Sequence, residues 1–556
     1  MQQRITINLN TDSKTTDKTT ILEYCRSHGI AGIETPCGGK GTCGKCKVTV
    51  AKPYYKDVLA CQTKICDGME IIVGRKESIG TKEDSMVVLT NGGNVSEKFN
   101  EHVNRNVVLK EETANESEKV ESNEDTLAAC DIGTTTVVCY LIDKETGQII
   151  STRSGANPQR SFGADVLSRI DAAARADDND KANGGLQMMQ TQIVSLLNGW
   201  ISEMLTECGR TKVSRFSVAG NTVMCHLLMG ISPEKLGKAP FMPDEYFGRE
   251  FNPLDIGLEN CQTMIIFPAV SGFVGGDITA GMMETVNCNE LTLYLDIGTN
   301  GEMALGKGDR YVCCATAAGP AFEGAQIELG MPASKGAVDK VWLEGRRIKY
   351  SVIGNDRPVG LCGSGLIDAL AVLLKAGIID ENGTILSGQE LPILFRSYVF
   401  EVEAEETAQS TELSLAVHIA PGVYITQEDI RKLQLAKGAI AAGIEVLFKE
   451  YGCKPCDLDI LTFAGGFGNY IDKASAAAIG LFPQELLDKA KEVGNAAGNG
   501  AVSAALSQEA WKRALDISGN MRYIELASYP HFNEMYVEHM NCLLYTSPSP
   551  RDSTSS

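Results

Sequence analysis

The sequence has no run of about 18 consecutive apolar residues, the length that a transmembrane helix needs, so we expect no membrane-spanning segment. Its first residues, MQQRITINLNTDSK, lack the apolar stretch of a signal peptide, which favours the cytoplasm. Positive charge is scarce as well, because 51 Lys and Arg stand against 71 Asp and Glu, a net charge of −20. A phosphate backbone or an anionic membrane would be repelled, so we expect no nucleic-acid partner and no membrane partner.

A chain of 556 residues is too long for one hydrophobic core, and we expect two to four domains. Strand and helix patterns alternate along the last four hundred residues, which predicts mixed α/β layers. The chain also contains 18 cysteines. In a large cytoplasmic protein this number indicates metal ligands and buried thiols, not a disulfide framework.

One short pattern, an apolar strand followed by an acid and a glycine turn, occurs at residues 127–136 and again at residues 293–302. Backbone N–H groups in such turns can surround phosphate oxygens, and an acid at the strand end can hold Mg²⁺ or its bound water. One copy alone could be an ordinary hairpin, but two copies suggest a duplicated unit facing a shared cleft. The candidate residues are the acids Asp131 and Asp296 and the turn residues Gly133, Thr134, Thr135, Gly298, Thr299 and Asn300.

Near the N-terminus, four cysteines have the spacing of a metal site: Cys37, Cys43, Cys46 and Cys61. Four thiolates could hold Zn²⁺ or an iron–sulfur cluster. The single Cys-x2-Cys knuckle with a glycine loop before it favours a [2Fe-2S] cluster and resembles plant-type and adrenodoxin-type ferredoxins. Because the gap before Cys61 is short for that family, Cys66 is the alternative fourth ligand, and Cys25 is interpreted as a core thiol.

Further polar and glycine-rich stretches follow the two turns. Asn221 could order a water or a metal ligand or could simply form a turn, and Lys437 could line a nucleoside pocket or lie in solvent on a helix over residues 428–449. Arg160, in the polar loop 157–165, could reach a phosphate or a partner, although an exposed arginine on a surface loop is the more usual role. The remaining candidates are glycine or serine residues that allow close backbone approach or anion binding: Gly363, Ser364, Gly465, Gly466 and Gly468.

In this order the motifs resemble the actin-like ATPase superfamily of sugar kinases, heat-shock chaperones and actin. The resemblance implies an α+β ferredoxin (β-grasp) domain followed by a two-lobed α/β actin-like (ribonuclease H-like) ATPase domain. It also implies that the two acid-tipped turns bind ATP phosphates and Mg²⁺, while Gly465, Gly466 and Gly468 hold adenosine. The expected boundaries are 1–75 for the ferredoxin, 76–125 for a flexible acidic linker, 126–540 for the ATPase and 541–556 for a disordered tail.

A ferredoxin fused to such an ATPase resembles the ATP-dependent reductive activators of corrinoid proteins. The sequence segments that carry this resemblance are LACQT, NPQRSFGAD, LCGSGLID and FAGGFG. That family implies one-electron reduction of cobalt(II) to cobalt(I) in a corrinoid methyltransferase protein, with a [2Fe-2S] cluster, ATP and Mg²⁺ as cofactors. Larger relatives carry a small extra domain where this chain has only the linker, which puts a homodimer in doubt. The electron donor is not indicated.

Two other functions remain open. One is a redox-gated ATPase switch, like a chaperone, that delivers no electrons, and the other is a small-molecule kinase with an attached ferredoxin. A kinase needs an acid beside an acceptor pocket, which the sequence does not reveal. The Ser- and Pro-rich end, residues 543–556, also resembles translated adapter read-through, and we assign it no function.

Overall fold

The computed structural model describes residues 4–9, 19–27, 33, 46–52, 56–66, 69–74, 126–175, 184–298, 300–403, 413–465 and 470–541. Within these ranges, none of the helices combines the length and the apolar character needed to cross a bilayer. The chain forms two compact units, one from residues 1–79, 96–284 and 497–519, the other from 80–95, 285–496 and 520–556. The predicted linker and the predicted tail lie outside the described residues, so the proposed domain boundaries stay predictions.

The N-terminal domain is a small antiparallel sheet with one helix. Its elements are β1 (Arg4–Leu9), α1 (Ile21–Ser27), β2 (Lys47–Lys52), β3 (Lys56–Leu59) and β4 (Met69–Gly74), with the strand order β1-β4-β2-β3. Ile21, Val50 and Ile71 are fully buried between the helix and the sheet.

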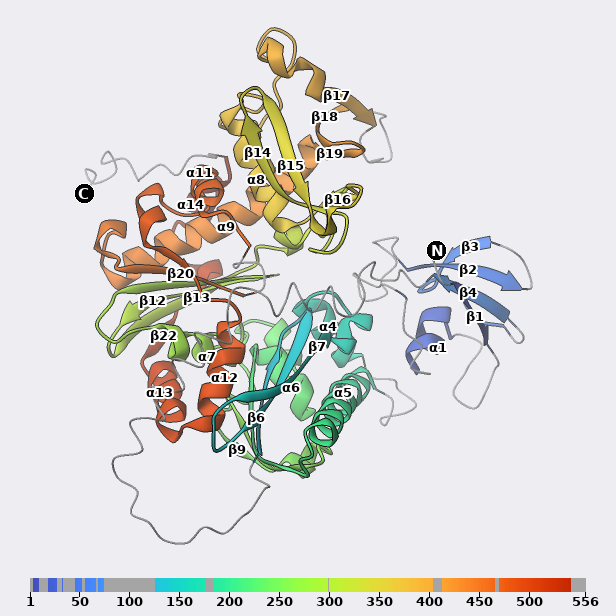
Figure 1. Ribbon diagram of the computed structural model, residues 1–556, viewed down its shortest axis with the longest axis vertical. Coiled ribbons are helices and arrows are strands. Elements are labelled where there is room, and N and C mark those ends of the chain that lie inside the picture. Colours follow the sequence, from blue (N-terminus) through green and yellow to red (C-terminus); the bar gives the residue numbers. More distant parts are fainter. Residues whose placement is uncertain are drawn as a thin grey trace. The chain divides into compact units, whose positions relative to one another are not determined.

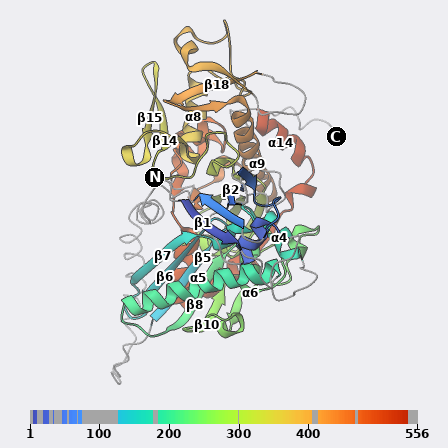
Figure 2. The same ribbon diagram turned by 90° about the vertical axis from the view of Figure 1, so that its right-hand side faces the viewer.

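The first unit also contains a six-stranded sheet of order β7-β6-β5-β8-β10-β9. The sheet and its helices are β5 (Thr126–Ile132), β6 (Thr136–Asp143), β7 (Ile149–Ala156), α4 (Val166–Ala174), α5 (Gly185–Glu207), β8 (Val213–Gly220), α6 (Thr222–Met229), β9 (Arg249–Phe251), β10 (Cys261–Ile266), α7 (Gly276–Thr285) and α13 (Gln508–Gly519). Helix α12 (Ala496–Leu506) belongs to the same unit except for its first residue. Helix α5 lies along one face of this sheet in both ribbon views (Figures 1 and 2). Its buried apolar stripe packs on the strands.

The second unit repeats this plan in a sheet of order β21-β20-β11-β12-β13-β22. Its elements are β11 (Thr292–Ile297), β12 (Gly301–Lys307), β13 (Arg310–Thr316), α9 (Gln427–Tyr451), β20 (Ile460–Ala464), α11 (Lys473–Ala478), β21 (Ala490–Glu492), β22 (Met521–Tyr523) and α14 (Phe532–Asn541). Between β13 and β20 the chain adds two small sheets and a helix: β14 (Ala337–Glu344), β15 (Arg347–Val352), β16 (Gly360–Leu361), α8 (Gly363–Lys375), β17 (Val399–Glu403), β18 (Leu413–Ala420) and β19 (Val423–Thr426).

The two large sheets share one five-strand arrangement, as the repeated motif predicted. They differ in the sixth strand, because β9 pairs with β10 in the first sheet and β22 pairs with β13 in the second. In each, an antiparallel three-strand meander (β5-β6-β7 or β11-β12-β13) is extended by parallel strands (β8 and β10, or β20 and β21). The register is copied too, because Asp131 pairs in parallel with Ala219 and Asp296 pairs in parallel with Ala464. The acids therefore occupy equivalent places: beside Asp131 strand β8 ends in Gly220, and beside Asp296 strand β20 is followed directly by Gly465.

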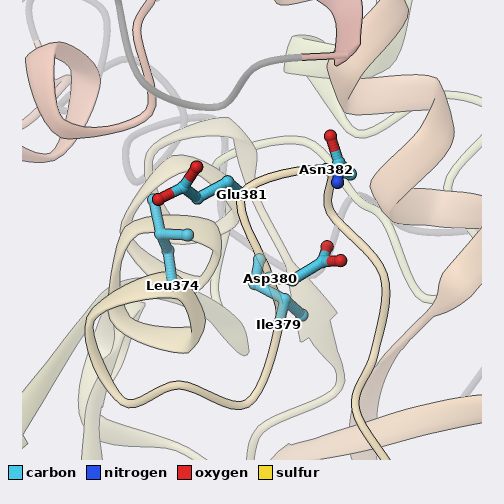
Figure 3. A pocket seen from close by; sticks show the side chains of 5 residues that line it. All are labelled: Leu374, Ile379, Asp380, Glu381 and Asn382. Atoms are coloured by element: carbon cyan, nitrogen blue, oxygen red, sulfur yellow. The ribbon is translucent and has the colours of Figure 1, made fainter.

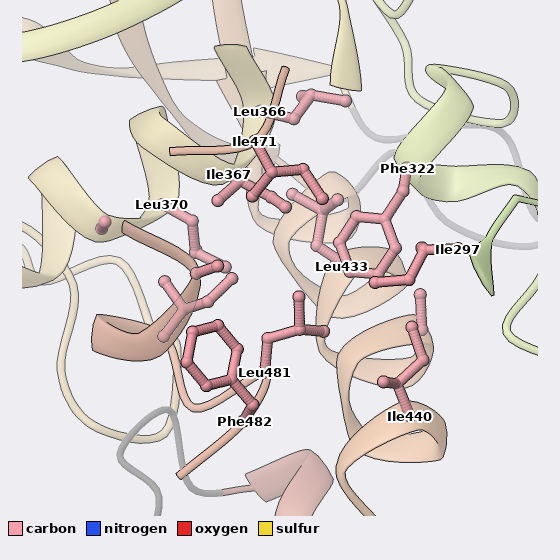
Figure 4. Packing of buried hydrophobic residues seen from close by; sticks show 14 of the residues in the cluster. Ile297, Phe322, Leu366, Ile367, Leu370, Leu433, Ile440, Ile471, Leu481 and Phe482 are labelled. Atoms are coloured by element: carbon pink, nitrogen blue, oxygen red, sulfur yellow. The ribbon is translucent and has the colours of Figure 1, made fainter. Parts of the chain in front are cut away.

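Helix α9 forms the main support of the second sheet. Thr426 and Asp429 form a reciprocal capping box at its start, and Gly452 ends it with a positive φ of 78°. Figure 4 shows Leu433 and Ile440 of this helix grouped with Ile297, which lies directly after Asp296. The packing therefore fixes the strand end that carries the acid. Helix α14, which the sequence analysis did not predict, packs along α9.

Candidate functional site

The first half of the site is the turn between β5 and β6. The Gly133 N–H donates to the Thr136 carbonyl oxygen over 2.9 Å, and a Cβ at Gly133 would lie 2.7 Å from that oxygen. A side chain at position 133 would therefore prevent so tight a turn, and glycine is required there. Asp131 lies at the end of β5, and Gly133 and Thr134 follow in the turn, as predicted.

The turn is held from behind by two polar side chains. Asn157 donates its backbone N–H to the Thr135 carbonyl over 2.9 Å and its Nδ2 to the Gly133 carbonyl over 2.8 Å. Arg169, which is fully buried, donates Nη2 to the Thr134 carbonyl. Burial lowers the pKa of Arg169 to about 9. The carbonyl oxygens of the turn therefore point away from any ligand, which leaves its N–H side for anions.

Asn221 begins helix α6 and also contacts the phosphate-type turn. Its Oδ1 accepts the Met224 N–H over 2.9 Å and caps helix α6, while its Nδ2 donates to the Thr134 hydroxyl over 3.0 Å. One side chain thus joins the end of β8 to the phosphate-type turn. Its role toward a metal-bound water stays a prediction.

Asp277, at the start of α7, is an acid of this half-site that the sequence analysis did not select. A Cβ on the neighbouring Gly275 would lie 2.5 Å from the Asn221 Cα, so the helix start and Asn221 are in direct contact. The charges of Asp277 and Asp131 both raise the pKa of the Cys225 thiol, after burial, so both carboxylates lie near the same side chain. Burial raises the pKa of Asp277 to about 6. The only signal in the sequence was a Gly-Gly-Asp triplet before a helix.

The pKa of Asp277 gives a stability prediction with a definite sign. Because the folded-state pKa lies above the usual 3.8, the ionised carboxylate disfavours folding, and this penalty grows as the pH rises from about 4 to about 6. We expect Asp277→Asn to raise the free energy of unfolding by about 3 kcal/mol at pH 8 and by only about 0.5 kcal/mol at pH 4. Urea unfolding at the two pH values checks this, and equal shifts at both would contradict it.

The second half of the site is the turn between β11 and β12. The Gly298 N–H donates to the Asn300 carbonyl over 2.9 Å, and Asn300 Nδ2 donates to Glu302 Oε1 over 3.2 Å. Glu302 is buried and pairs across the strands with Asp296, so a second carboxylate accompanies the predicted one. Thr299, another predicted residue, lies outside the described residues.

Gly465 is the residue of the adenosine motif that the structure describes, since Gly466 and Gly468 lie outside the described residues. It follows β20 directly, with φ at +81°. A Cβ there would lie 2.4 Å from Asp296 Oδ1. The glycine therefore lets the strand end approach the acid.

Two other predicted sites have structural roles. At the start of α8, the Ser364 hydroxyl donates to the Asp339 carbonyl over 2.8 Å, and a Cβ at Gly365 would lie 2.2 Å from the Val338 carbonyl. Small residues at and beside Gly363 thus allow the helix to pack on β14. Anion binding by Gly363 and Ser364 stays a prediction. Lys437 is 0% exposed, so the alternative of a solvated lysine on α9 is wrong.

The described part of the predicted cluster site brings two cysteines together. Cys46 Sγ and Cys61 Sγ lie 3.2 Å apart, with Cys46 buried and Cys61 half-buried. Cys66 is exposed, and Cys37 and Cys43 lie outside the described residues. Burial raises the pKa of Cys25 to about 11, which suits a core thiol. The paired thiols fit a shared iron, since thiolates are the ligands of Fe–S clusters.

This geometry separates the two candidates for the fourth ligand. We expect Cys61→Ala to lose most of the visible absorbance and the iron content of the purified protein, because it removes the partner of Cys46. Cys66→Ala is the matched control and should keep both. Iron and sulfide analysis of the two variants distinguishes the two candidate ligands. Loss of iron from Cys66→Ala but not from Cys61→Ala would assign Cys66 in place of Cys61.

A pocket of about 550 Å³ lies elsewhere in the second unit, lined by Leu374, Ile379, Asp380, Glu381 and Asn382 (Figure 3). None of the predicted site residues lines it. Its polar groups are partly satisfied by its own loop, because Asp380 Oδ1 accepts the Thr384 N–H over 2.7 Å. The candidate site residues therefore lie in the two acid-tipped turns, one in each unit, and in the cysteine pair.

Comparison with known proteins agrees with this combination of parts. The corrinoid activation enzyme RamQ of Eubacterium limosum is 33% identical over 581 aligned positions, which cover 93% of this chain and 95% of RamQ. The chain belongs to the family of corrinoid reductive activators. Three family models match it: a 2Fe-2S iron-sulfur cluster binding domain at residues 7–66, the RACo middle region at 127–287, and the C-terminal ASKHA domain of RACo at 290–549.

Two further relatives support the assignment to the RACo family. The [Co(II) methylated amine-specific corrinoid protein] reductase of Methanosarcina barkeri is 27% identical over 397 positions, 64% of this chain and 65% of that protein. A solved structure titled "Reductive activator for corrinoid,iron-sulfur protein" is 29% identical, covers 96% of this chain and 97% of its own, and superposes with a TM-score of 0.64. The predicted fold class, a ferredoxin followed by an actin-like ATPase, is thereby confirmed, and this RACo-family chain is an enzyme.

Proposed function

We propose that this RACo-family chain reduces cobalt(II) to cobalt(I) in a corrinoid protein, one electron at a time, at the expense of ATP. The observation that carries the proposal is the presence in one chain of a facing cysteine pair, Cys46 and Cys61, and two copies of an acid-tipped glycine turn at Asp131 and Asp296. The names of the two curated relatives, a corrinoid activation enzyme and a Co(II) corrinoid protein reductase, support this substrate class.

In the proposed mechanism the two turns bind one nucleotide. The N–H groups of the Gly133 turn would receive phosphate oxygens, and Asp131 and Asn221 would be the residues that hold Mg²⁺ or its bound water. Asp296 acts likewise from the second turn, where Asn300 is held in place by Glu302. We expect the nucleoside at the glycine turn that begins with Gly465, where the missing side chain lets the strand end lie close to Asp296.

Cys46 and Cys61, with Cys37 and Cys43, would hold the [2Fe-2S] cluster, and when bound this group supplies a single electron at low potential. The electron goes to the cobalt(II) substrate, which becomes cobalt(I), and the chain must be reduced again by a separate donor. In this proposal the chain's own residues therefore position the cluster and bind the nucleotide.

ATP is needed in this account because the transfer is uphill. A gap of about 100–200 mV for one electron corresponds to roughly 2–5 kcal/mol. Coupling between two ligand sites typically supplies about 1–3 kcal/mol. Nucleotide binding and hydrolysis could therefore change the affinity for one cobalt state or ligation state enough for transfer to proceed.

The test mixes the cluster-loaded chain with a chemical reductant, MgATP and a cobalt(II) corrinoid protein under anaerobic conditions. We expect cobalt(I) absorbance to appear with ATP and to be at least tenfold slower without it. Phosphate transferred to a small acceptor would favour the kinase alternative. A nucleotide-dependent change in partner affinity without cobalt(I) would favour the redox-gated switch.

A further inference from the structure

The polar loop between β7 and α4 has an inner and an outer side. Its inner side is Asn157, which donates to the Gly133 carbonyl over 2.8 Å and to the Thr135 carbonyl over 2.9 Å. Arg169 closes the same connection, since it donates Nε to the Gly163 carbonyl over 3.0 Å and Nη2 to the Thr134 carbonyl. Because these donors are buried, the loop and the phosphate-type turn are expected to move together.

The outer side of the loop receives the ferredoxin domain. Arg26, in the last turn of α1, donates Nε and Nη2 to the Ser161 carbonyl over 2.9 and 2.6 Å. Its guanidinium also lies 5.1 Å from the centre of the buried Phe162 ring, within cation–π range. One arginine therefore makes a charge-assisted and an aromatic contact with adjacent residues.

Helix α1 is in turn tied to the segment that carries Cys61. The Leu22 N–H donates to the Ala60 carbonyl over 3.0 Å, and the Ile21 N–H donates to the Thr63 carbonyl over 2.8 Å. A continuous series of hydrogen bonds thus runs from the predicted cluster ligand to the predicted phosphate turn. Such a series can carry coupling between two sites, and this must be measured.

We propose that residues 157–162, which we call the docking loop, are the surface on which helix α1 of the ferredoxin docks, and that docking and nucleotide binding strengthen each other. The proposal rests on the ATP binding proposed above. A nucleotide that orders the Gly133 turn also orders Asn157 and hence the docking loop, so the docked helix meets a surface already in place. Because linkage is reciprocal, loss of docking weakens nucleotide binding by the same factor.

The experiment uses the full-length, cluster-loaded chain and a non-hydrolysable ATP analogue with Mg²⁺. Calorimetry measures the dissociation constant for the original chain, for Arg26→Ala and for Lys56→Ala, which removes an exposed charge from strand β3 elsewhere on the ferredoxin. We expect Arg26→Ala to raise the dissociation constant about fivefold, near the lower end of usual couplings, and Lys56→Ala to leave it within twofold. An unchanged visible spectrum shows that the ferredoxin remains folded.

Hydrogen exchange of α1 provides a second readout. The analogue should slow exchange at residues 21–27 in the original chain and in Lys56→Ala, and should have no effect there in Arg26→Ala. Three results would overturn the docking proposal alone. They are equal nucleotide affinities in all three proteins, tighter nucleotide binding by Arg26→Ala, and hydrogen exchange at residues 21–27 that the nucleotide does not change in the original chain. If the original chain binds no nucleotide, the proposed function fails as well, so the two failures are distinguishable.

Discussion

Gly465→Ala is expected to lower the rate of ATP-dependent cobalt reduction by at least about 100-fold. The new Cβ would lie 2.4 Å from Asp296 Oδ1, so either the carboxylate or the end of β20 must move. Displacement of a reacting group by about 1 Å is enough for a loss of this size. The assay is cobalt(I) formation at saturating MgATP, with nucleotide affinity measured alongside.

Gly422→Ala is the matched control for the backbone strain. Gly422 has nearly the same φ, +77° against +81°, and a Cβ there meets nothing within 4 Å. Both substitutions cost about 1–2 kcal/mol from the left-handed conformation, but only Gly465→Ala disturbs an acid of the site. Equal activity losses in the two variants would show that strain, and not the contact with Asp296, is responsible.

Asp131→Asn is expected to reduce ATP-dependent cobalt reduction about 10³-fold while leaving the iron content unchanged. The substitution keeps the size of the side chain but removes the charge that would hold Mg²⁺ or its water, which is worth several kcal/mol in a transition state. Asp309→Asn, in the exposed turn between β12 and β13, is the control for loss of one negative charge.

The outcome for Asp131→Asn separates two views of the ATPase. If cobalt reduction proceeds at full rate with a complete cluster, nucleotide chemistry at this turn is not needed, and the ferredoxin acts alone. If the rate falls while electron transfer to an artificial acceptor stays normal, the cluster is intact and the nucleotide step is what has been lost.

The features predicted from the sequence are those that neighbouring residues determine. The strand-turn-strand at Asp131 and its copy at Asp296 follow from local periodicity and glycine placement, and the structure has them. The duplicated sheet was predictable as well, because the same local pattern occurs twice and demands the same pairing.

What could not be predicted depends on contacts between distant segments. Asp277 becomes part of the first half-site only because the start of α7 packs on Asn221, and nothing in its own neighbourhood shows this. Lys437 lies on a helix with polar positions, so local pattern could not show that packing leaves it fully buried. Arg26 likewise acquires its contacts from Ser161 and Phe162, 135 residues away in the case of Ser161.

The most direct test of the account is a donor-free single turnover. The cluster-loaded chain is reduced, freed of reductant and mixed anaerobically with one equivalent of cobalt(II) corrinoid protein, and the cobalt(I) and cluster absorbances are followed together. With MgATP, we predict that about one cobalt(I) forms for each cluster that is oxidised, and that without ATP less than a tenth of this amount forms. Equal yields with and without ATP, or cluster oxidation without cobalt(I), would contradict the account.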